Sequence, residues 1–254
     1  MRMTCLSRLV GLGVLGLALL PWGAHAESPV LPSVLPSSGG VSRVALDMSG
    51  DSTSQHGGSF DASVTWAPFG SIDASGWRLR LVNSSSRYAY PADERRSRLV
   101  RGKSQETDVM VGYGMAVPGL SIVALLGYAA ARSEEEGQVG RTDGLRSTVS
   151  LFAAPSPRHM LYASVSHTAM SAYTQLLVKG GVRSGQGQPY VGPEAKADWR
   201  NTDPWRQAPG VWRIGAHVSG ISLGDTAWSL SGGRVQDRAL GVGGYLSLGA
   251  YASF

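Results

Sequence analysis

The chain has 254 residues, 16% of them charged and 34 of them glycine, and its formal net charge is +5. This small positive excess does not favour nucleic-acid binding. Beyond the first 26 residues the longest apolar stretch is residues 120–131. That is too short for a membrane-spanning helix and argues against a helical membrane protein.

The first 26 residues have the pattern of a secretory signal peptide. Arg2 and Arg8 precede an apolar run over residues 9–20, and Ala24-His25-Ala26 fits a cleavage site. We expect the mature chain to begin after this site, with 228 residues. The single cysteine, Cys5, is removed with the signal, so no disulfide is expected.

A Pro/Ser-rich entry segment, residues 27–40, precedes a single predicted β domain over residues 41–254. In that domain apolar and polar residues alternate over segments of the length that a tilted membrane strand needs, about nine to eleven residues. We predict about twelve strands, or ten if residues 188–197 are irregular. The segments lie near residues 43–49, 59–66, 77–81, 107–115, 122–130, 145–153, 161–169, 172–179, 188–197, 212–219, 228–234 and 241–254.

The last predicted strand has two distinct faces and ends on an aromatic residue. One face carries Leu246, Leu248, Ala250, Ala252 and Phe254, and the other carries Tyr245, Ser247, Gly249, Tyr251 and Ser253. This pattern resembles the closing strand of bacterial outer-membrane β-barrels, in which one face meets lipid and the other the lumen. The expected location is therefore the bacterial outer membrane.

The connections between predicted strands alternate in length. Residues 117–120, 155–159 and 222–225 read as short turns, whereas residues 84–103, 133–143 and 198–210 read as long polar loops. Outer-membrane barrels have short periplasmic turns and longer extracellular loops. The sequence thus predicts an all-β, antiparallel transmembrane barrel. A soluble periplasmic β-sandwich is the alternative, since it also alternates apolar and polar residues.

His217 and Ser219 are two residues apart and therefore share one face of a predicted strand. A base beside a hydroxyl is what an acyl hydrolase needs, and the pair resembles that of outer-membrane lipid A deacylases. However, only Asp225 and Asp237 follow it, with no glutamate within a hairpin's length. We interpret it as a hydrogen-bonding pair in the lumen and expect no catalytic residue. The segment Gly220-x-Ser222-x-Gly224 matches the G-x-S-x-G motif of a nucleophile elbow. However, it falls at a predicted turn between strands, whereas a nucleophile elbow is followed by a helix.

Basic residues crowd the first predicted long loop. They are Arg87, Arg95, Arg96, Arg98, Arg101 and Lys103. Guanidinium groups match phosphate geometry, so binding of lipopolysaccharide phosphates or an anionic glycan is one interpretation. A solvated loop with ion pairs to Asp93 and Glu94 is the other.

The sequence gives no metal site and no cofactor site. Glu134, Glu135 and Glu136 are consecutive and lack ligand spacing, and His56, His159 and His167 occur singly. The lumen is expected to hold charged residues together with several Tyr and Ser, either as packing or as a sugar-contacting surface. These charged residues are Arg43, Asp47, Asp61, Arg78, Arg80 and Arg213.

Several short motifs resemble the cellulose biosynthesis protein BcsS family. They are Gly76-Trp77-Arg78-Leu79-Arg80 leading to Tyr88-Ala89-Tyr90, then Val191-Gly192-Pro193-Glu194, then residues 212–220 (WRIGAHVSG), and finally residues 228–232 before the last strand. Between Asp198 and Val211 the chain carries an extra loop, which contains Pro204-Trp205 and Pro209-Gly210.

The resemblance implies a non-enzymatic outer-membrane barrel associated with bacterial cellulose biosynthesis or export. The expected partners are outer-membrane lipid or lipopolysaccharide, and cellulose or other components of the cellulose synthase complex, with no nucleic acid. Two alternatives stay open: a lipid A acyl hydrolase using His217 and Ser219, and a general small porin or structural barrel. No ligand residues follow from the resemblance.

Overall fold

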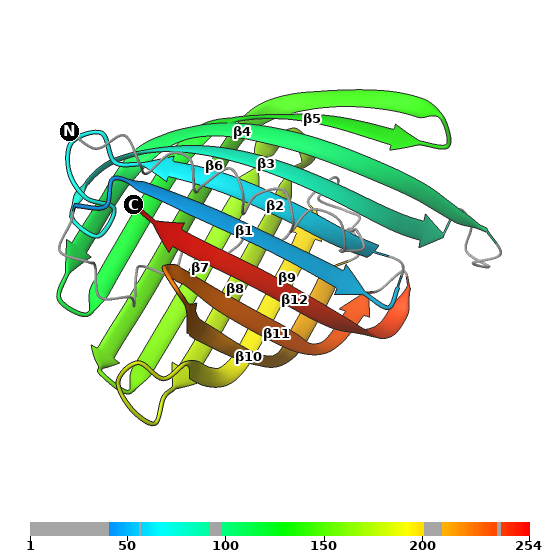
Figure 1. Cartoon of the computed structure of the whole chain (residues 1–254). Helices are drawn as coiled ribbons and strands as arrows, with labels where there is room; N and C mark the ends of the chain where they lie inside the picture. The colour runs from blue at the N-terminus through cyan, green and yellow to red at the C-terminus, as the bar shows by residue number, and fades with distance from the viewer. Residues whose placement is uncertain (1–40, 56, 92–97, 201–209, 238–239) are drawn as a thin grey trace.

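The computed structural model describes residues 41–55, 57–91, 98–200, 210–237 and 240–254. They form a closed barrel of antiparallel strands in which each strand pairs with its neighbours in sequence and β12 pairs with β1 (Figure 1). A single closed sheet excludes the two-sheet sandwich. Among these residues, no helix is both long and apolar enough to cross a membrane.

The twelve strands confirm the predicted all-β barrel. They are β1 (Val44–Thr53), β2 (Gly57–Trp66), β3 (Gly76–Pro91), β4 (Leu99–Val117), β5 (Leu120–Glu135), β6 (Gln138–Ser156), β7 (His159–Thr168), β8 (Tyr173–Val182), β9 (Tyr190–Arg200), β10 (Val211–Leu223), β11 (Thr226–Asp237) and β12 (Gly241–Ser253). A short 3₁₀ helix, η1 (Ala169–Ser171), joins β7 to β8. Because β9 is regular, the number of strands is twelve and not ten.

Polar side chains face the lumen and apolar side chains face outward. On β2, Ser59, Asp61 and Ser63 are buried, whereas Val64 and Trp66 are exposed. β10 repeats the pattern, with Arg213, His217 and Ser219 buried while Trp212 and Ile214 are exposed. This arrangement is the reverse of a water-soluble domain, in which apolar side chains are buried. It is the arrangement of a lipid-facing barrel wall.

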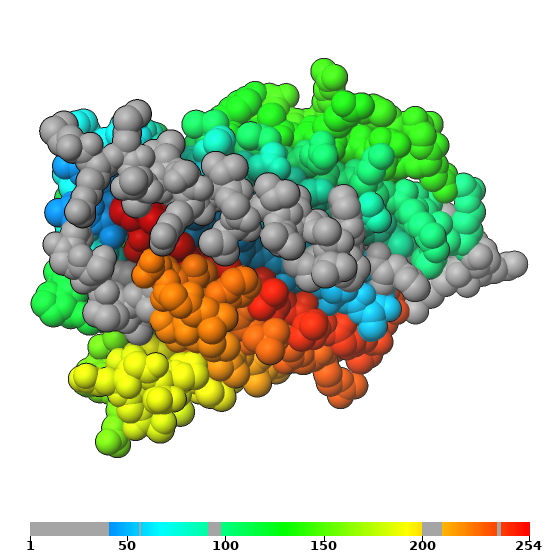
Figure 2. Space-filling view, in the orientation of Figure 1, coloured from blue at the N-terminus to red at the C-terminus, as the bar shows by residue number. Residues whose placement is uncertain are grey.

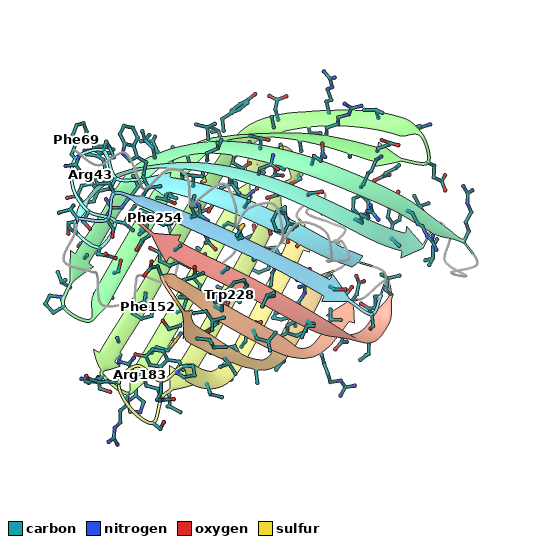
Figure 3. The ribbon with its side chains drawn as sticks, viewed as in Figure 1. Arg43, Phe69, Phe152, Arg183, Trp228 and Phe254 are labelled. Atoms are coloured by element: carbon teal, nitrogen blue, oxygen red, sulfur yellow. The ribbon has the colours of Figure 1, made fainter. Side chains whose placement is uncertain are left out.

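The two ends of the barrel differ. The connections β4–β5, β6–β7 and β10–β11 have two residues each and lie at the end where β1 starts and β12 finishes, which we call the turn end. There the Phe254 carbonyl accepts hydrogen bonds from the amides of Arg43 and Val44, so the last residue is tied to the first strand. Figure 3 shows Arg43, Phe69 and Phe254 at this end.

At the opposite end, β3 to β6 run beyond their neighbours (Figures 1 and 2). Residues 88–91 of β3 pair only with β4, and residues 138–145 of β6 pair only with β5. We call residues 88–91, 99–105, 130–135 and 138–143 the extension. The opposite end is called the extended end.

The extension corrects the prediction of long loops over residues 84–103 and 133–143. Both segments are largely strand, and residues 133–143 form a hairpin closed at Glu136 and Gly137, whose φ angles are 48° and 84°. Positive φ at both positions is the geometry of a two-residue hairpin turn. The two segments lie beyond the apolar band, so neither face of their strands needs apolar residues. Without apolar alternation, their sequence did not indicate strands. Residues 198–200 of the third predicted loop likewise belong to β9.

Several predicted features lie outside the described residues. They are the signal peptide 1–26, the entry segment 27–40, His56, Asp93, Glu94, Arg95, Arg96, Pro204-Trp205 and Pro209.

Candidate functional site

The lumen holds a nearly balanced set of buried charges. Seven acidic and six basic side chains face it, all with little exposed surface: Asp47, Asp51, Asp61, Glu106, Asp108, Glu194 and Asp198, with Arg78, Arg80, Arg146, Lys179, Lys196 and Arg213. The structure places all of the charged residues predicted for the lumen there except Arg43. That prediction was wrong, because Arg43 precedes β1 and is exposed. Buried charges need partners, since an unpaired charge is costly away from water.

Arg146 on β6 is central to one half of this network. Its guanidinium pairs with Glu106 on β4 and lies 2.8 Å (Nη1 to Oδ2) from Asp108, which is also on β4. All three side chains are at most 7% exposed. One cation therefore compensates two carboxylates that have almost no access to solvent.

The other half joins five strands, β8, β9, β10, β12 and β1, in one chain of contacts. Lys179 Nζ lies 2.7 Å from Glu194 Oε2, and the Tyr245 hydroxyl donates to Glu194 Oε1 at 3.0 Å. Arg213 lies over the Tyr245 ring, 5.8 Å from its centroid, and pairs with Asp51 at 2.5 Å (Nη1 to Oδ2).

A glycine makes room for Tyr245. A Cβ atom on Gly215 would lie 2.5 Å from the Tyr245 hydroxyl and 2.2 Å from the Gly232 carbonyl oxygen. Only glycine therefore lets the phenol extend from β12 across β11 and β10 to Glu194 on β9.

Charges from opposite walls interact across the lumen. Asp61 on β2 interacts electrostatically with Arg146 on β6 and with Lys196 on β9. On the same side, Arg80 lies 3.8 Å from Asp47 and donates to the Ser63 hydroxyl at 3.2 Å. Charged and hydroxyl side chains therefore line this part of the lumen.

A loop and an apolar cluster lie at the turn end. Arg78 donates to the carbonyls of Ser71 and Ile72 at 3.0 Å each, and also to that of Ala74, which holds the β2–β3 loop over this mouth. The cluster beside it consists of Met160, Tyr162, Leu177, Tyr190 and Phe152. A cavity of about 40 Å³ lies between loop and cluster, lined in part by Ile72, Arg78 and Phe152.

His217 and Ser219 form the predicted hydrogen-bonding pair, with 2.8 Å between Nδ1 and Oγ. The other ring nitrogen, Nε2, lies 3.1 Å from the Gly180 carbonyl oxygen on β8. That carbonyl accepts only, so Nε2 carries the proton and Nδ1 accepts from the serine. Both side chains are 1% exposed. The imidazole is therefore oriented by a backbone carbonyl, and the pair is closed to a large substrate.

The Gly220-x-Ser222-x-Gly224 segment joins two strands, as predicted. Gly220 sits at a bulge of β10 with φ of 81°, and Gly224 lies in the β10–β11 turn with φ of 60°. Neither conformation suits other residues. The segment therefore shapes a hairpin.

The three consecutive glutamates have separate partners. Glu134 pairs with Lys103 at 2.9 Å, Glu136 pairs with Arg98 at 2.6 Å, and Glu135 faces the other side of the sheet. His159 and His167 bond to hydroxyls of Ser156 and Thr174, at 2.7 and 2.9 Å. In the described ranges, no three His, Cys, Asp or Glu side chains gather as metal ligands would.

Two tyrosines form a ledge on the inner face of the extension. Tyr88 and Tyr90 follow Ser84 and Ser86, which face the lumen, and their rings lie 6.4 Å apart at an interplanar angle of 19°. Both hydroxyls donate to Glu135 on β5, at 2.6 and 2.9 Å. The bond to Glu135 raises the pKa of Tyr90 above its ordinary value, so this phenol stays protonated.

Gly102 makes this tyrosine ledge possible. A Cβ atom there would lie 2.5 Å from the Tyr88 ring, so the ring occupies the place of a side chain on β4. Tyr88 therefore reaches across β4, and both rings are fixed at their tips by one carboxylate. The prediction of a long loop over residues 84–103 concealed this site. The alternation Tyr88-Ala89-Tyr90 was the available signal.

Comparisons with known proteins agree with the barrel. Residues 44–254 match the family described as cellulose biosynthesis protein BcsS. LpxR from Salmonella typhimurium aligns with a TM-score of 0.54 and 13% identity, over 83% of this chain and 100% of that chain. The β domain of the Bordetella autotransporter BrkA aligns with a TM-score of 0.47 and 14% identity, over 83% and 98%. At such identities the LpxR likeness shows the fold alone. No curated protein matches the chain.

Proposed function

Because this chain belongs to the cellulose biosynthesis protein BcsS family, we propose that it is an outer-membrane barrel that assists cellulose production at the cell surface without catalysing a reaction. The family match over residues 44–254 is the observation that carries the proposal. The outward apolar band and the fold shared with LpxR support the membrane location. In this orientation the turn end faces the periplasm and the extended end faces the cell exterior.

The contents of the lumen favour a supporting role over an export pore. Buried ion pairs line the lumen, and Arg78 holds the β2–β3 loop at the turn end. A glucan chain passing through would have to break buried charge pairs, each of which is costly to separate. The same observations weigh against a general small porin. We therefore propose that cellulose meets the extended end of the barrel, on the inner face of the extension.

The tyrosine ledge is the surface that best fits a β-glucan there. Tyrosine combines an apolar ring with a polar tip, and sugar rings present apolar C–H faces with hydroxyls at their edges. Glu135 fixes the hydroxyls of Tyr88 and Tyr90, so the rings lose little conformational freedom on binding.

The alternative of a lipid A acyl hydrolase has no support from the position of its residues. His217 and Ser219 face the lumen and are 1% exposed, whereas a lipid substrate lies against the outer wall. No carboxylate orients the imidazole, and a Ser–His pair without that group is a weak nucleophile system.

Deletion of the gene tests the proposed role. We expect less exported cellulose or altered cellulose, and unchanged lipid A acylation. Complementation with the His217→Ala/Ser219→Ala variant should restore cellulose as well as the wild type does. Cellulase-released glucose and mass spectrometry of lipid A are the two measurements. Unchanged cellulose in the deletion strain would remove the pathway role, and a deacylated lipid A that depends on His217 would establish an enzyme instead.

Removal of the tyrosine ledge tests the proposed glucan contact. The Tyr88→Ala/Tyr90→Ala variant should bind amorphous cellulose about 30-fold more weakly in a pull-down of purified protein, because each of the two aromatic contacts contributes roughly 1 kcal/mol. Tyr128→Ala is the matched control, since Tyr128 is also an exposed tyrosine beside the extension but faces outward. Equal binding by the wild type and the double variant would refute this contact.

A further inference from the structure

Basic side chains collect on the outward face of the extension. They are Arg101, Lys103, Arg132 and Arg141, all exposed, and we call them the basic face. They point to the same side as Val109, Tyr128 and Leu145, which are exposed on the same three strands. Nitrogen-tipped side chains project from this part of the ribbon in Figure 3. The basic face thus continues the outer wall beyond its apolar band.

The register places two arginines directly opposite each other. Arg132 on β5 pairs with Arg141 on β6, and like charges in this position destabilise a sheet. Lys103 is paired with Glu134 at 2.9 Å, and Asp143 bonds to the Tyr128 hydroxyl. Within the described part of the chain, no ion pair joins Arg132 or Arg141 to a carboxylate. The two guanidinium groups are therefore available to an external anion.

Along the barrel axis, the two arginines lie at the level expected for lipid headgroups. Arg132 lies four residues beyond Tyr128, the last exposed aromatic residue of the outer wall on β5. At about 3.3 Å per residue and a strand tilt of about 40°, the arginine lies roughly 10 Å above that tyrosine along the barrel axis. Headgroups occupy this zone just outside the hydrocarbon core.

We propose that the basic face binds the phosphate groups of a phosphorylated glycolipid in the leaflet around the extended end. The inference rests on the membrane location in the proposed function, but not on the role in cellulose production. Guanidinium groups bind phosphate through two parallel hydrogen bonds. A phosphate between Arg132 and Arg141 would also remove their mutual repulsion. The sequence pointed to phosphate binding through Arg87 to Lys103, and the fold adds Arg132 and Arg141 to that set.

Lipid binding by purified barrel in detergent micelles tests this site. Bisphosphorylated lipid A is titrated against wild type and against the Arg132→Gln/Arg141→Gln variant, with bound lipid counted by native mass spectrometry. We expect the double variant to bind about tenfold more weakly, since charge-assisted bonds to phosphate are lost. Arg158→Gln, which removes an exposed arginine in a turn-end connection, should bind as the wild type does. A heat-modifiable gel band checks that each variant is folded.

Two further binding experiments identify which part of the lipid the basic face recognises. Dephosphorylated lipid A should bind wild type as weakly as bisphosphorylated lipid A binds the double variant, and inorganic phosphate at the same concentration should not compete. Equal binding of lipid A by wild type and the double variant would overturn the proposal. So would equal binding of the phosphorylated and dephosphorylated lipids, since the acyl chains would then suffice. Either outcome is independent of the cellulose yield of a deletion strain.

Discussion

Replacement of Arg146 with Met should lower the free energy of unfolding by about 3 to 5 kcal/mol, the cost of leaving buried carboxylates without their cation. Glu106 and Asp108 both depend on this guanidinium, and neither is more than 7% exposed. The loss should appear in urea unfolding of the refolded barrel in detergent micelles. Tryptophan fluorescence and heat-modifiable gel migration are the readouts.

An exposed ion pair between the neighbouring strands β4 and β5 supplies the control. Lys103 and Glu134 are 61% and 38% exposed, so Lys103→Met should cost no more than about 1 kcal/mol. Neutralising the carboxylates in the Arg146→Met/Glu106→Gln/Asp108→Asn variant should recover much of the stability. An Arg146→Met barrel as stable as Lys103→Met would show that the interior is wet and that the charges are not coupled.

Replacement of Val149 with Arg should destabilise the barrel by about 2 to 4 kcal/mol in a lipid bilayer, the cost of an arginine near the midplane. Val149 is 44% exposed on the outward face of β6, within the apolar band. The measurement is unfolding by denaturant from lipid vesicles, because detergent micelles adapt to a charged side chain more readily than a bilayer does.

The same strand provides a matched control for the bilayer effect. Val139 also faces outward on β6 and is 52% exposed, but it lies in the extension beyond the apolar band. Val139→Arg should therefore change stability by less than about 0.5 kcal/mol. Equal losses at the two positions would mean that no bilayer surrounds Val149.

The faces of the strands were predictable because an apolar outer wall and a polar lumen require opposite kinds of residue at alternate positions. On β2 the alternating polar residues are Ser59, Asp61, Ser63 and Thr65, and on β10 they are Arg213, His217 and Ser219; the structure buries all of them in the lumen. The short turns then indicated at which end of the barrel each strand begins and ends. The extension was not predictable in this way. Polar residues occupy both of its faces, so its alternation carries no apolar signal, and residues 133–143 read as a loop.

The partners inside the lumen could not be deduced from the sequence. Arg213 and Asp51 are 162 positions apart and meet only because the barrel closes between β12 and β1. Tyr245 reaches Glu194 because Gly215 leaves room for its hydroxyl, which no local pattern indicates. The sequence did identify His217 and Ser219 as a pair. Residues two positions apart on one strand share a face, however the barrel closes.

The orientation of the barrel in the outer membrane underlies both proposals, and cysteine labelling in intact cells tests it most directly. The only cysteine of the chain is Cys5, inside the predicted signal peptide, so the expected mature chain provides a cysteine-free background. Gln138→Cys places a thiol at the tip of the extension, and Arg158→Cys places one in a turn-end connection. A membrane-impermeant maleimide should label the Gln138→Cys variant in intact cells, and the Arg158→Cys variant only after the outer membrane is permeabilised. The reverse pattern, or equal labelling of both variants in intact cells, would contradict the account.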